Sequence, residues 1–210
     1  MKLIFLGPPG AGKGTQAAIV CKKLDIPSIS TGDMLRSAIK EGTEVGKQAQ
    51  SYMDAGKLVP NEVVIGIVVE RVAKPDCAKG YILDGVPRTI AQAEALEKAG
   101  IRFDHVISIE TADEVVMGRL SGRRVCPGCG ATFHVTGNPP KQEGICDACG
   151  QALVQRKDDT AETIQNRLAV YHQETEPLKA FYEQRGLLRK VADDGGIEST
   201  NNAIMAILGK

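Results

Sequence analysis

Residues 7–15 read Gly-Pro-Pro-Gly-Ala-Gly-Lys-Gly-Thr and directly follow the apolar run Leu3-Ile4-Phe5-Leu6. This order is typical of a buried strand that enters a glycine-rich turn and then a helix. Such a turn directs several backbone N–H groups into one small volume, where the partial charge of the helix N-terminus and the full charge of Lys13 add to them. The stretch therefore predicts a polyphosphate site. The alternative, a glycine turn with a surface lysine, is disfavoured by the strand before it and the helix after it.

One position departs from the common form of this pattern. Gly7, Gly12 and Lys13 match G-x-x-x-x-G-K, but Gly14 stands where a serine or threonine is usual, and the hydroxyl comes only at Thr15. The sequence therefore does not decide whether the turn binds Mg²⁺ directly or through water.

Composition excludes several classes of protein. The 210 residues suit one principal domain with one or two insertions. Lys and Arg number 26, as do Asp and Glu, which argues against a nucleic-acid-binding protein that relies on overall positive charge. There is no tryptophan, and aromatic residues make up only 4%, so few side chains could stack on bases. No apolar run approaches membrane-spanning length, and we expect a cytoplasmic protein with reduced cysteines.

Strand and helix patterns alternate from residue 1 to about residue 121, which predicts an α/β fold with a central parallel sheet flanked by helices. Polar turns at 30–33 and 84–89 follow predicted strands, at the edge where such sheets bind ligands. The predicted strands are 2–6, 26–29, 80–83, 105–109 and 187–191. The predicted helices are 13–24, 34–40, 43–55, 61–72 (capped by Asn61), 89–98, one from 111 or 113, 160–185 and 203–208.

A cysteine-rich insert interrupts this alternation at residues 122–159. It holds two C-x₂-C pairs sixteen residues apart, formed by Cys126, Cys129, Cys146 and Cys149. Four thiolates at this spacing are typical of a tetrahedral Zn²⁺ site, whereas two disulfides or four unrelated cysteines are disfavoured in a reducing compartment. Four protein ligands leave no open position on the metal. We therefore expect a structural zinc that holds together a segment too small to build its own core.

Arginines gather at the predicted strand ends and around this insert. A single arginine is usually solvated or paired with a surface carboxylate. Together, their positions predict that the insert acts as a lid and brings positive charges over phosphate groups. The planar guanidinium group is well suited to binding phosphate oxygens. These arginines are Arg36, Arg88, Arg119, Arg123, Arg156 and Arg167.

Several of these stretches resemble the adenylate kinase family, in its bacterial form with a long, zinc-bearing lid. The resemblance covers nearly the whole chain and departs from the family at Val86, where phenylalanine is usual, and at Phe133, where tyrosine is common. The matching stretches are residues 7–15, Ser30-Thr31-Gly32-Asp33-Met34-Leu35-Arg36, Asp84-Gly85-Val86-Pro87-Arg88-Thr89, and a lid from Gly122-Arg123-Arg124 to Arg156-Lys157-Asp158-Asp159.

The resemblance implies a P-loop nucleoside-triphosphate fold in three parts. These are a core (residues 1–29, 60–121 and 160–210), an AMP-binding helical insert (30–59) and the zinc-bearing lid (122–159). It further implies reversible transfer of the terminal phosphoryl group of Mg-ATP to AMP, giving two ADP, as both inserts close over the substrates. The expected partners are ATP, AMP and ADP, with Mg²⁺ and structural Zn²⁺ as cofactors. No nucleic acid or membrane partner is expected, and relatives suggest a monomer.

The resemblance also assigns roles to individual residues. The catalytic residues would be Lys13, Arg88, Arg123, Arg156 and Arg167. ATP would be bound by Gly10, Ala11, Gly12, Lys13, Gly14, Thr15, Arg119 and Arg123, and in relatives the arginine at the Arg119 position also stacks on the adenine. AMP would be bound by Thr31, Arg36, Lys57, Val59, Gly85, Arg88, Gln92, Arg156 and Arg167. Mg²⁺ would be oriented through its waters by Asp33 and Asp84, and the lid arginines by Asp158 and Asp159.

Two other functions are compatible with the motifs alone. A kinase of UMP, CMP or GMP would share most of them, because adenine selectivity rests only on the resemblance at Thr31 and Gln92. A non-catalytic nucleotide-dependent switch or a zinc-ribbon adaptor would need a single nucleotide site. This chain has two further turns that could bind phosphate, at 30–36 and 84–89. A second nucleotide site favours a kinase.

Overall fold

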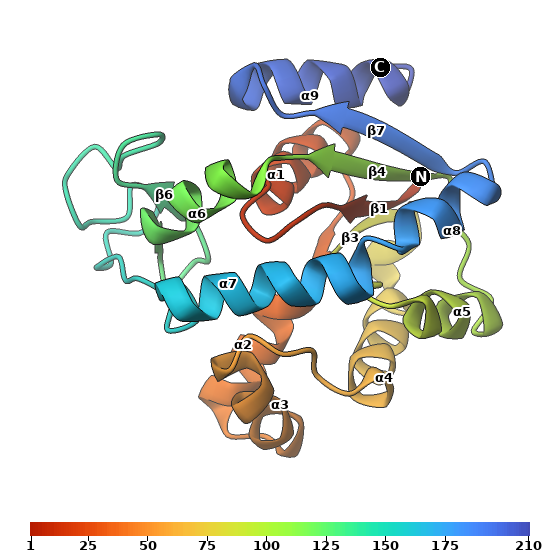
Figure 1. Cartoon of the computed structure of the whole chain (residues 1–210), viewed down its shortest axis with the longest axis horizontal. Helices are drawn as coiled ribbons and strands as arrows, with labels where there is room; N and C mark the ends of the chain where they lie inside the picture. Colours follow the sequence, from red (N-terminus) through yellow and green to blue (C-terminus); the bar gives the residue numbers. More distant parts are fainter.

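The computed structural model describes residues 1–210 and contains a five-stranded parallel sheet in the order β2-β3-β1-β4-β7. The carboxyl ends of the strands meet at one edge, which faces left in Figure 1. The predicted α/β class with a central parallel sheet is confirmed. Its strands are β1 (Lys2–Leu6), β2 (Ser28–Ser30), β3 (Tyr81–Asp84), β4 (His105–Glu110) and β7 (Leu188–Ala192).

One face of the sheet is covered by α1 (Lys13–Leu24) and α9 (Gly196–Ile207) (Figure 1). Leu3 and Phe5 of β1 are fully buried in the apolar cluster that these helices complete. Burial of side chains of this size stabilises a fold by about 1.5–3 kcal/mol each. This packing holds the start of α1 directly behind the turn that joins it to β1.

The opposite face is covered by α4 (Asn61–Val72), α5 (Ile90–Lys98) and α8 (Leu178–Gln184). Ile4 and Leu6 lie in this second cluster. Because alternate residues of a strand point to opposite faces, the single run of β1 belongs to both cores. None of the helices has the length and apolarity that a membrane-crossing segment requires.

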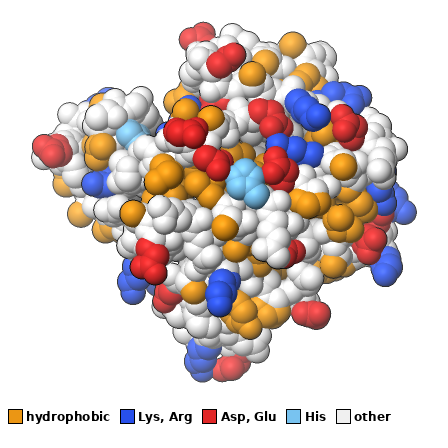
Figure 2. Space-filling view, viewed as in Figure 1, with side chains coloured by type: hydrophobic (Ala, Val, Ile, Leu, Met, Phe, Trp, Pro, Cys, Tyr) orange, Lys and Arg blue, Asp and Glu red, His pale blue; other side chains and the backbone are white.

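Two segments lie outside these layers. The first consists of α2 (Thr31–Glu41) and α3 (Glu44–Asp54), at the bottom of Figure 1. The second, the cysteine-rich insert, contains the antiparallel ribbon of β5 (Arg123–Val125) and β6 (Thr132–His134) and forms the lobe at the left of Figure 2. This lobe is joined to the core by α6 (Asp113–Ser121) and α7 (Ala161–Val170).

Side-chain hydrogen bonds explain where helix ends differ from the sequence prediction. The first insert helix begins at Thr31 rather than Met34, because the Ser30 hydroxyl accepts a hydrogen bond from the Asp33 amide (3.3 Å) and caps the helix there. Asn61 does not cap α4. Its Oδ1 instead accepts a hydrogen bond from Gln92 Nε2 (2.9 Å).

Two larger errors have separate causes, buried polar residues in the first case and a proline in the second. α9 begins at Gly196 rather than 203, because Thr200 and Asn201, which resemble loop residues, are buried and hydrogen-bonded. The helix predicted for 160–185 is divided by a π-helical turn, η2 (Tyr171–Thr175), and Pro177 then precedes α8. Proline cannot donate the hydrogen bond that a continuous helix needs. Smaller differences are β2, which begins at Ser28, and a short 3₁₀ turn, η1 (Pro75–Cys77), before β3.

A stability prediction follows from the contact between α2 and α3. A Cβ atom at Gly46 would lie 2.1 Å from the Ala38 carbonyl oxygen, so we expect Gly46→Ala to lower the free energy of unfolding by about 2–3 kcal/mol. Gly66→Ala in α4 is the matched control, because a Cβ atom added there would meet no other atom within 4 Å. We expect that change to stabilise the protein by about 0.5–1 kcal/mol through helix propensity. Urea denaturation measures both, and equal effects would contradict the close packing.

Candidate active site

The glycine-rich turn creates an anion site at the start of α1. The helix has no side-chain cap, and Gly12 precedes it in the left-handed conformation (φ 81°), which glycine adopts without strain. The first amide groups of α1 are therefore left for a ligand. Lys13 Nζ donates hydrogen bonds to the carbonyl oxygens of Gly7 (2.9 Å) and Pro8 (2.8 Å). The ammonium group thus lies against the same turn.

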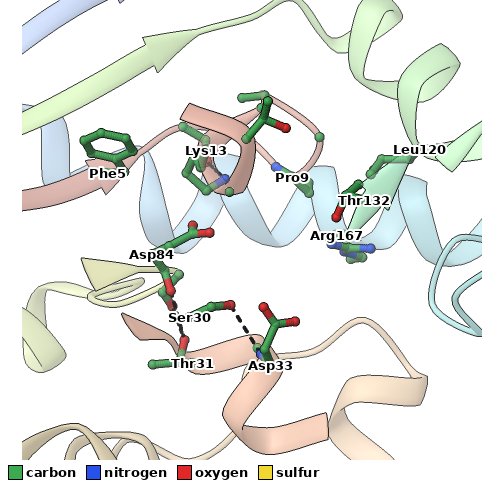
Figure 3. A pocket seen from close by; sticks show the side chains of 18 of the residues that line it. Phe5, Pro9, Lys13, Ser30, Thr31, Asp33, Asp84, Leu120, Thr132 and Arg167 are labelled. Atoms are coloured by element: carbon green, nitrogen blue, oxygen red, sulfur yellow. Dashed lines mark hydrogen bonds between the residues drawn. The ribbon is translucent and has the colours of Figure 1, made fainter. Parts of the chain in front are cut away.

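A cavity of about 700 Å³ opens beside this turn, which is a size typical of small-molecule sites. Figure 3 shows Lys13 and Asp84 close together within it, with Arg167 and Thr132 approaching from another side. Every residue that the sequence predicted for ATP, AMP or Mg²⁺ lines this cavity. They are Gly10, Ala11, Gly12, Lys13, Gly14, Thr15, Thr31, Asp33, Arg36, Lys57, Val59, Asp84, Gly85, Arg88, Gln92, Arg119, Arg123, Arg156 and Arg167.

Positive charge is concentrated in this cavity. Its walls carry eight Lys and Arg side chains but only four Asp and no Glu, although the chain as a whole has no net charge. On the outer face shown in Figure 2, basic and acidic side chains are interspersed instead. A cleft lined by one sign of charge attracts the opposite one, so the cavity is suited to a polyanion. The basic residues are Lys13, Arg36, Lys57, Arg88, Arg119, Arg123, Arg156 and Arg167.

The pKa values of these groups reflect their crowding. Burial lowers the pKa of Lys13 to about 8, with Asp84 opposing the shift and Arg88 reinforcing it. Desolvation lowers the pKa of Arg88 to about 10, and the charge of Arg167 acts in the same direction. Burial also raises the pKa of Asp84, although Lys13 and Arg88 oppose this. Mutual repulsion between desolvated cations would be relieved by an anionic ligand between them.

Arg123 of the lid and Arg167 of α7 are held by two adjacent carboxylates, Asp158 and Asp159. Arg123 makes a two-point ion pair with the buried Asp159, at 2.8 Å and 2.6 Å. Arg167 contacts Asp159 Oδ1 (3.0 Å) and Asp158 Oδ2 (3.1 Å). Arg156 is much less constrained, because its Nε is buried without a partner and its nearest carboxylate, Asp33, is 3.5 Å away. Arg156 therefore retains donors for a ligand.

The turn after β3 is fixed from several sides. Thr31 Oγ1 and Arg88 Nε both donate hydrogen bonds to the Gly85 carbonyl oxygen, at 3.0 Å and 2.8 Å. The Gln92 side chain accepts a hydrogen bond from the Arg88 amide (2.7 Å). Arg36 is held by Asp33 at 2.6 Å. Thr31 and Gln92 thus line the cavity and also brace the turn, a role that the sequence pattern did not indicate.

The four cysteines of the lid come together as a candidate metal site. Their Sγ atoms all lie within 4.8 Å of one another, and none forms a disulfide. A tetrahedral Zn²⁺ with bonds of about 2.3 Å separates its sulfur ligands by about 3.8 Å. Cys126 and Cys149 are 3.3 Å apart, and Cys129 and Cys146 are 3.5 Å apart. Both the donor set and the spacing fit this ion.

Sequence reasoning missed part of the cavity wall. Phe133 and His134 of the lid, together with Asp193, Gly196 and Ile197 after β7, also line the cavity. Asp193 directly follows the carboxyl end of a strand, which is the signal that revealed the turns after β2 and β3. It was missed because the following helix was expected only at 203.

Comparisons with known proteins agree with this geometry. The family model described as adenylate kinase matches residues 5–187. A protein named adenylate kinase from Carboxydothermus hydrogenoformans is 55% identical over 214 residues, which cover 100% of both chains. Proteins of the same name from Moorella thermoacetica and Lachnospira eligens are 54% and 52% identical, over 100% of this chain and 99% and 100% of theirs.

The pKa of Lys13 predicts that phosphate binding at the glycine-rich turn depends on pH. Only the ammonium form attracts a phosphate, and with a pKa of about 8 this form predominates below pH 8 and is lost above it. We therefore expect ATP affinity, measured by calorimetry, to fall by about tenfold between pH 7 and pH 9. Lys13→Arg, whose side chain stays charged, should abolish this dependence. An unchanged pH dependence in Lys13→Arg would show that another group is responsible.

Proposed function

Because this chain belongs to the adenylate kinase family, we propose that its cavity holds ATP and AMP together, with their phosphate groups meeting among the clustered cations. The enzyme transfers the terminal phosphoryl group of ATP to AMP, which gives two ADP. Family membership sets aside the kinases of UMP, CMP or GMP and the non-catalytic switch or adaptor. The observation that best supports the shared cavity is the concentration of basic side chains between the glycine-rich turn and the turn after β3.

On the donor side, we propose that the turn and first helical amides at Gly10, Ala11, Gly12, Gly14 and Thr15 hold the phosphates of ATP. The uncapped start of α1 supports this assignment. Lys13 and Arg123 would neutralise the phosphate charge. Arg119 would lie against the adenine base.

On the acceptor side, we propose that AMP binds among α2, α3 and the turn after β3. Arg36 and Arg88 would bind its phosphate, together with Arg156 and Arg167. Lys57, Val59 and the Gly85 backbone would line the pocket for its base and ribose, and Thr31 and Gln92 would complete it. The unpartnered Nε of Arg156 supports a ligand at this position.

The chemistry needs little beyond positioning and charge. The phosphate of AMP is already an anion at neutral pH, so no general base is required to activate it. The enzyme must hold two polyanions with the attacking and leaving oxygens in line, and negative charge spreads over the transferred group during the reaction. Cationic groups positioned beside the transferred group stabilise such charge, most strongly once the cavity has closed and excluded water. We propose that Lys13, Arg88, Arg123, Arg156 and Arg167 act in this way.

Exclusion of water is the task of the two inserts. We propose that residues 30–59 close over AMP and residues 122–159 over ATP, against a core of 1–29, 60–121 and 160–210, and that lid motion limits turnover. The division is supported by the sheet, whose strands belong to the core except for the last residue of β2, and by the separate ribbon in the lid. We also propose that the enzyme is a monomer, as the resemblance to relatives suggests.

Two metal ions complete the proposal. Mg²⁺ bound with ATP supplies further positive charge against the phosphates, and we propose that Asp33 and Asp84 hold its waters. Zn²⁺ at the four cysteines would be structural, because the apolar cluster of the lid contains only Cys126, Phe133 and Cys146 as buried members. A segment of this size needs a cross-link to stay folded.

Substitution of Arg88 tests the assignment of the acceptor side. We expect Arg88→Ala to raise the KM for AMP by about tenfold or more, because charge-assisted hydrogen bonds to a phosphate are lost, and to change the Kd for ATP by less than about twofold. Coupled steady-state assays and calorimetry measure the two quantities. Arg102→Ala, an arginine outside the cavity, is the matched control. Equal losses toward both nucleotides would contradict the assignment.

Removal of the metal tests the structural role of zinc. We expect the purified enzyme to bind one Zn²⁺ per chain, and chelation to lower the melting temperature because the folded lid loses its cross-link. Hydrogen exchange should place most of the added flexibility in residues 122–159. Cys21→Ala, which lies outside the cluster and keeps an apolar side chain, should lower the melting temperature on chelation by as much as in the unmodified protein. Identical melting with and without the metal would disprove the structural role.

A further inference from the structure

We propose that Asp193 is a positioning residue for Arg119 and so sets the affinity for the phosphoryl donor; this inference rests on the proposed contact between Arg119 and ATP. Asp193 follows β7, and its side chain is only 7% exposed. Its Oδ2 accepts hydrogen bonds from Arg119 Nη1 and from Thr111 Oγ1 (3.0 Å). Its Oδ1 accepts one from Thr200 Oγ1 (3.3 Å). All three contacts converge on a single carboxylate beside the cavity.

The charge of this carboxylate ties Arg119 to it. A nearly buried carboxylate is costly without a counter-ion, and Arg119 is the only basic side chain paired with Asp193. Arg119 itself has no other carboxylate partner, and at 36% exposure it reaches the cavity. The pair is therefore expected to persist when a ligand enters. Asp193 holds Nη1 of the guanidinium, and we infer that the flat face of Arg119 meets the base.

The backbone around Asp193 is braced as well. The Asp193 amide donates a hydrogen bond to the Glu110 carbonyl oxygen (3.1 Å), which fixes it to the end of β4. Gln16 Nε2 donates to the Ile197 carbonyl oxygen (2.8 Å), so α1 holds the same segment from its other end. The helix that carries the phosphate turn is thus linked to the segment that carries Asp193. The position of Arg119 relative to the phosphate site is fixed through this link.

This arrangement predicts an effect on binding rather than on the chemical step. A free arginine side chain loses conformational freedom when it binds a ligand, and an arginine already ordered by Asp193 loses less. An interaction made equally in the ground state and the transition state changes KM without changing kcat. Asp193 should therefore control the KM for ATP alone.

The test is Asp193→Asn, which keeps the shape of the side chain and removes its charge. We expect the KM for ATP to rise by about five- to twentyfold, while kcat and the KM for AMP change by less than about twofold. Thr111→Val, a milder change that removes one hydrogen bond to the carboxylate, should raise the KM for ATP to a smaller extent. The exposed neighbour provides the matched control, Asp194→Asn, which should leave all three constants unchanged. Melting temperatures of all variants confirm that they are folded.

A double-mutant cycle with Arg119→Ala separates this inference from the proposed function. If Asp193 acts through Arg119, then Asp193→Asn should add no further rise in the KM for ATP once Arg119 is absent. If Arg119→Ala raises that KM but Asp193→Asn and Thr111→Val do not, the inference is wrong and the proposed role of Arg119 stands. If Arg119→Ala leaves it unchanged, the proposed role itself fails. Parallel loss of kcat and of affinity for both nucleotides in Asp193→Asn would indicate a merely structural role and overturn the inference.

Discussion

Repulsion among cations in a desolvated space is the constraint on which the rest of this structure depends. A chain with no net charge gathers eight basic side chains around one cavity and leaves mixed charges on the outer face of Figure 2. Burial lowers the pKa values of Lys13 and Arg88, and neighbouring arginine charges reinforce both shifts, so this arrangement is unfavourable in the absence of ligand. The fold tolerates it because the carboxylates of Asp158, Asp159 and Asp193 form ion pairs with Arg119, Arg123 and Arg167. The repulsion that remains among the basic side chains then favours the binding of two polyanionic substrates.

Much of this arrangement could be predicted from the sequence. The alternation of strand and helix predicted the sheet, and the rule that ligands bind at its carboxyl edge was enough to bring residues 7–15, 30–36 and 84–89 together. The two C-x₂-C pairs predicted the cysteine cluster, because the spacing of metal ligands within each pair can be read directly from the sequence. Arg119, Arg123, Arg156 and Arg167 were found only as a group flanking the insert, and the resemblance to a known family supplied their separate roles.

What could not be predicted depends on partners distant in the sequence. Asp193 looks like an ordinary loop residue until Thr111, Arg119 and Thr200 are seen around it. Thr200 and Asn201 likewise read as helix-breaking polar residues, although burial against Asp193 and Gln16 makes them part of α9. Val86, which stands where phenylalanine is usual in the family, is fully buried in the larger core.

The dual burial of β1 has a consequence for how the molecule loses its structure. Its alternate residues belong to both apolar clusters, and the strand lies between β3 and β4 in the middle of the sheet. Its amide hydrogens can therefore exchange with solvent only when the whole molecule opens. The lid, with its own small cluster, can open by itself. The glycine-rich turn is thus attached to the last element to unfold, whereas the lid belongs to the first.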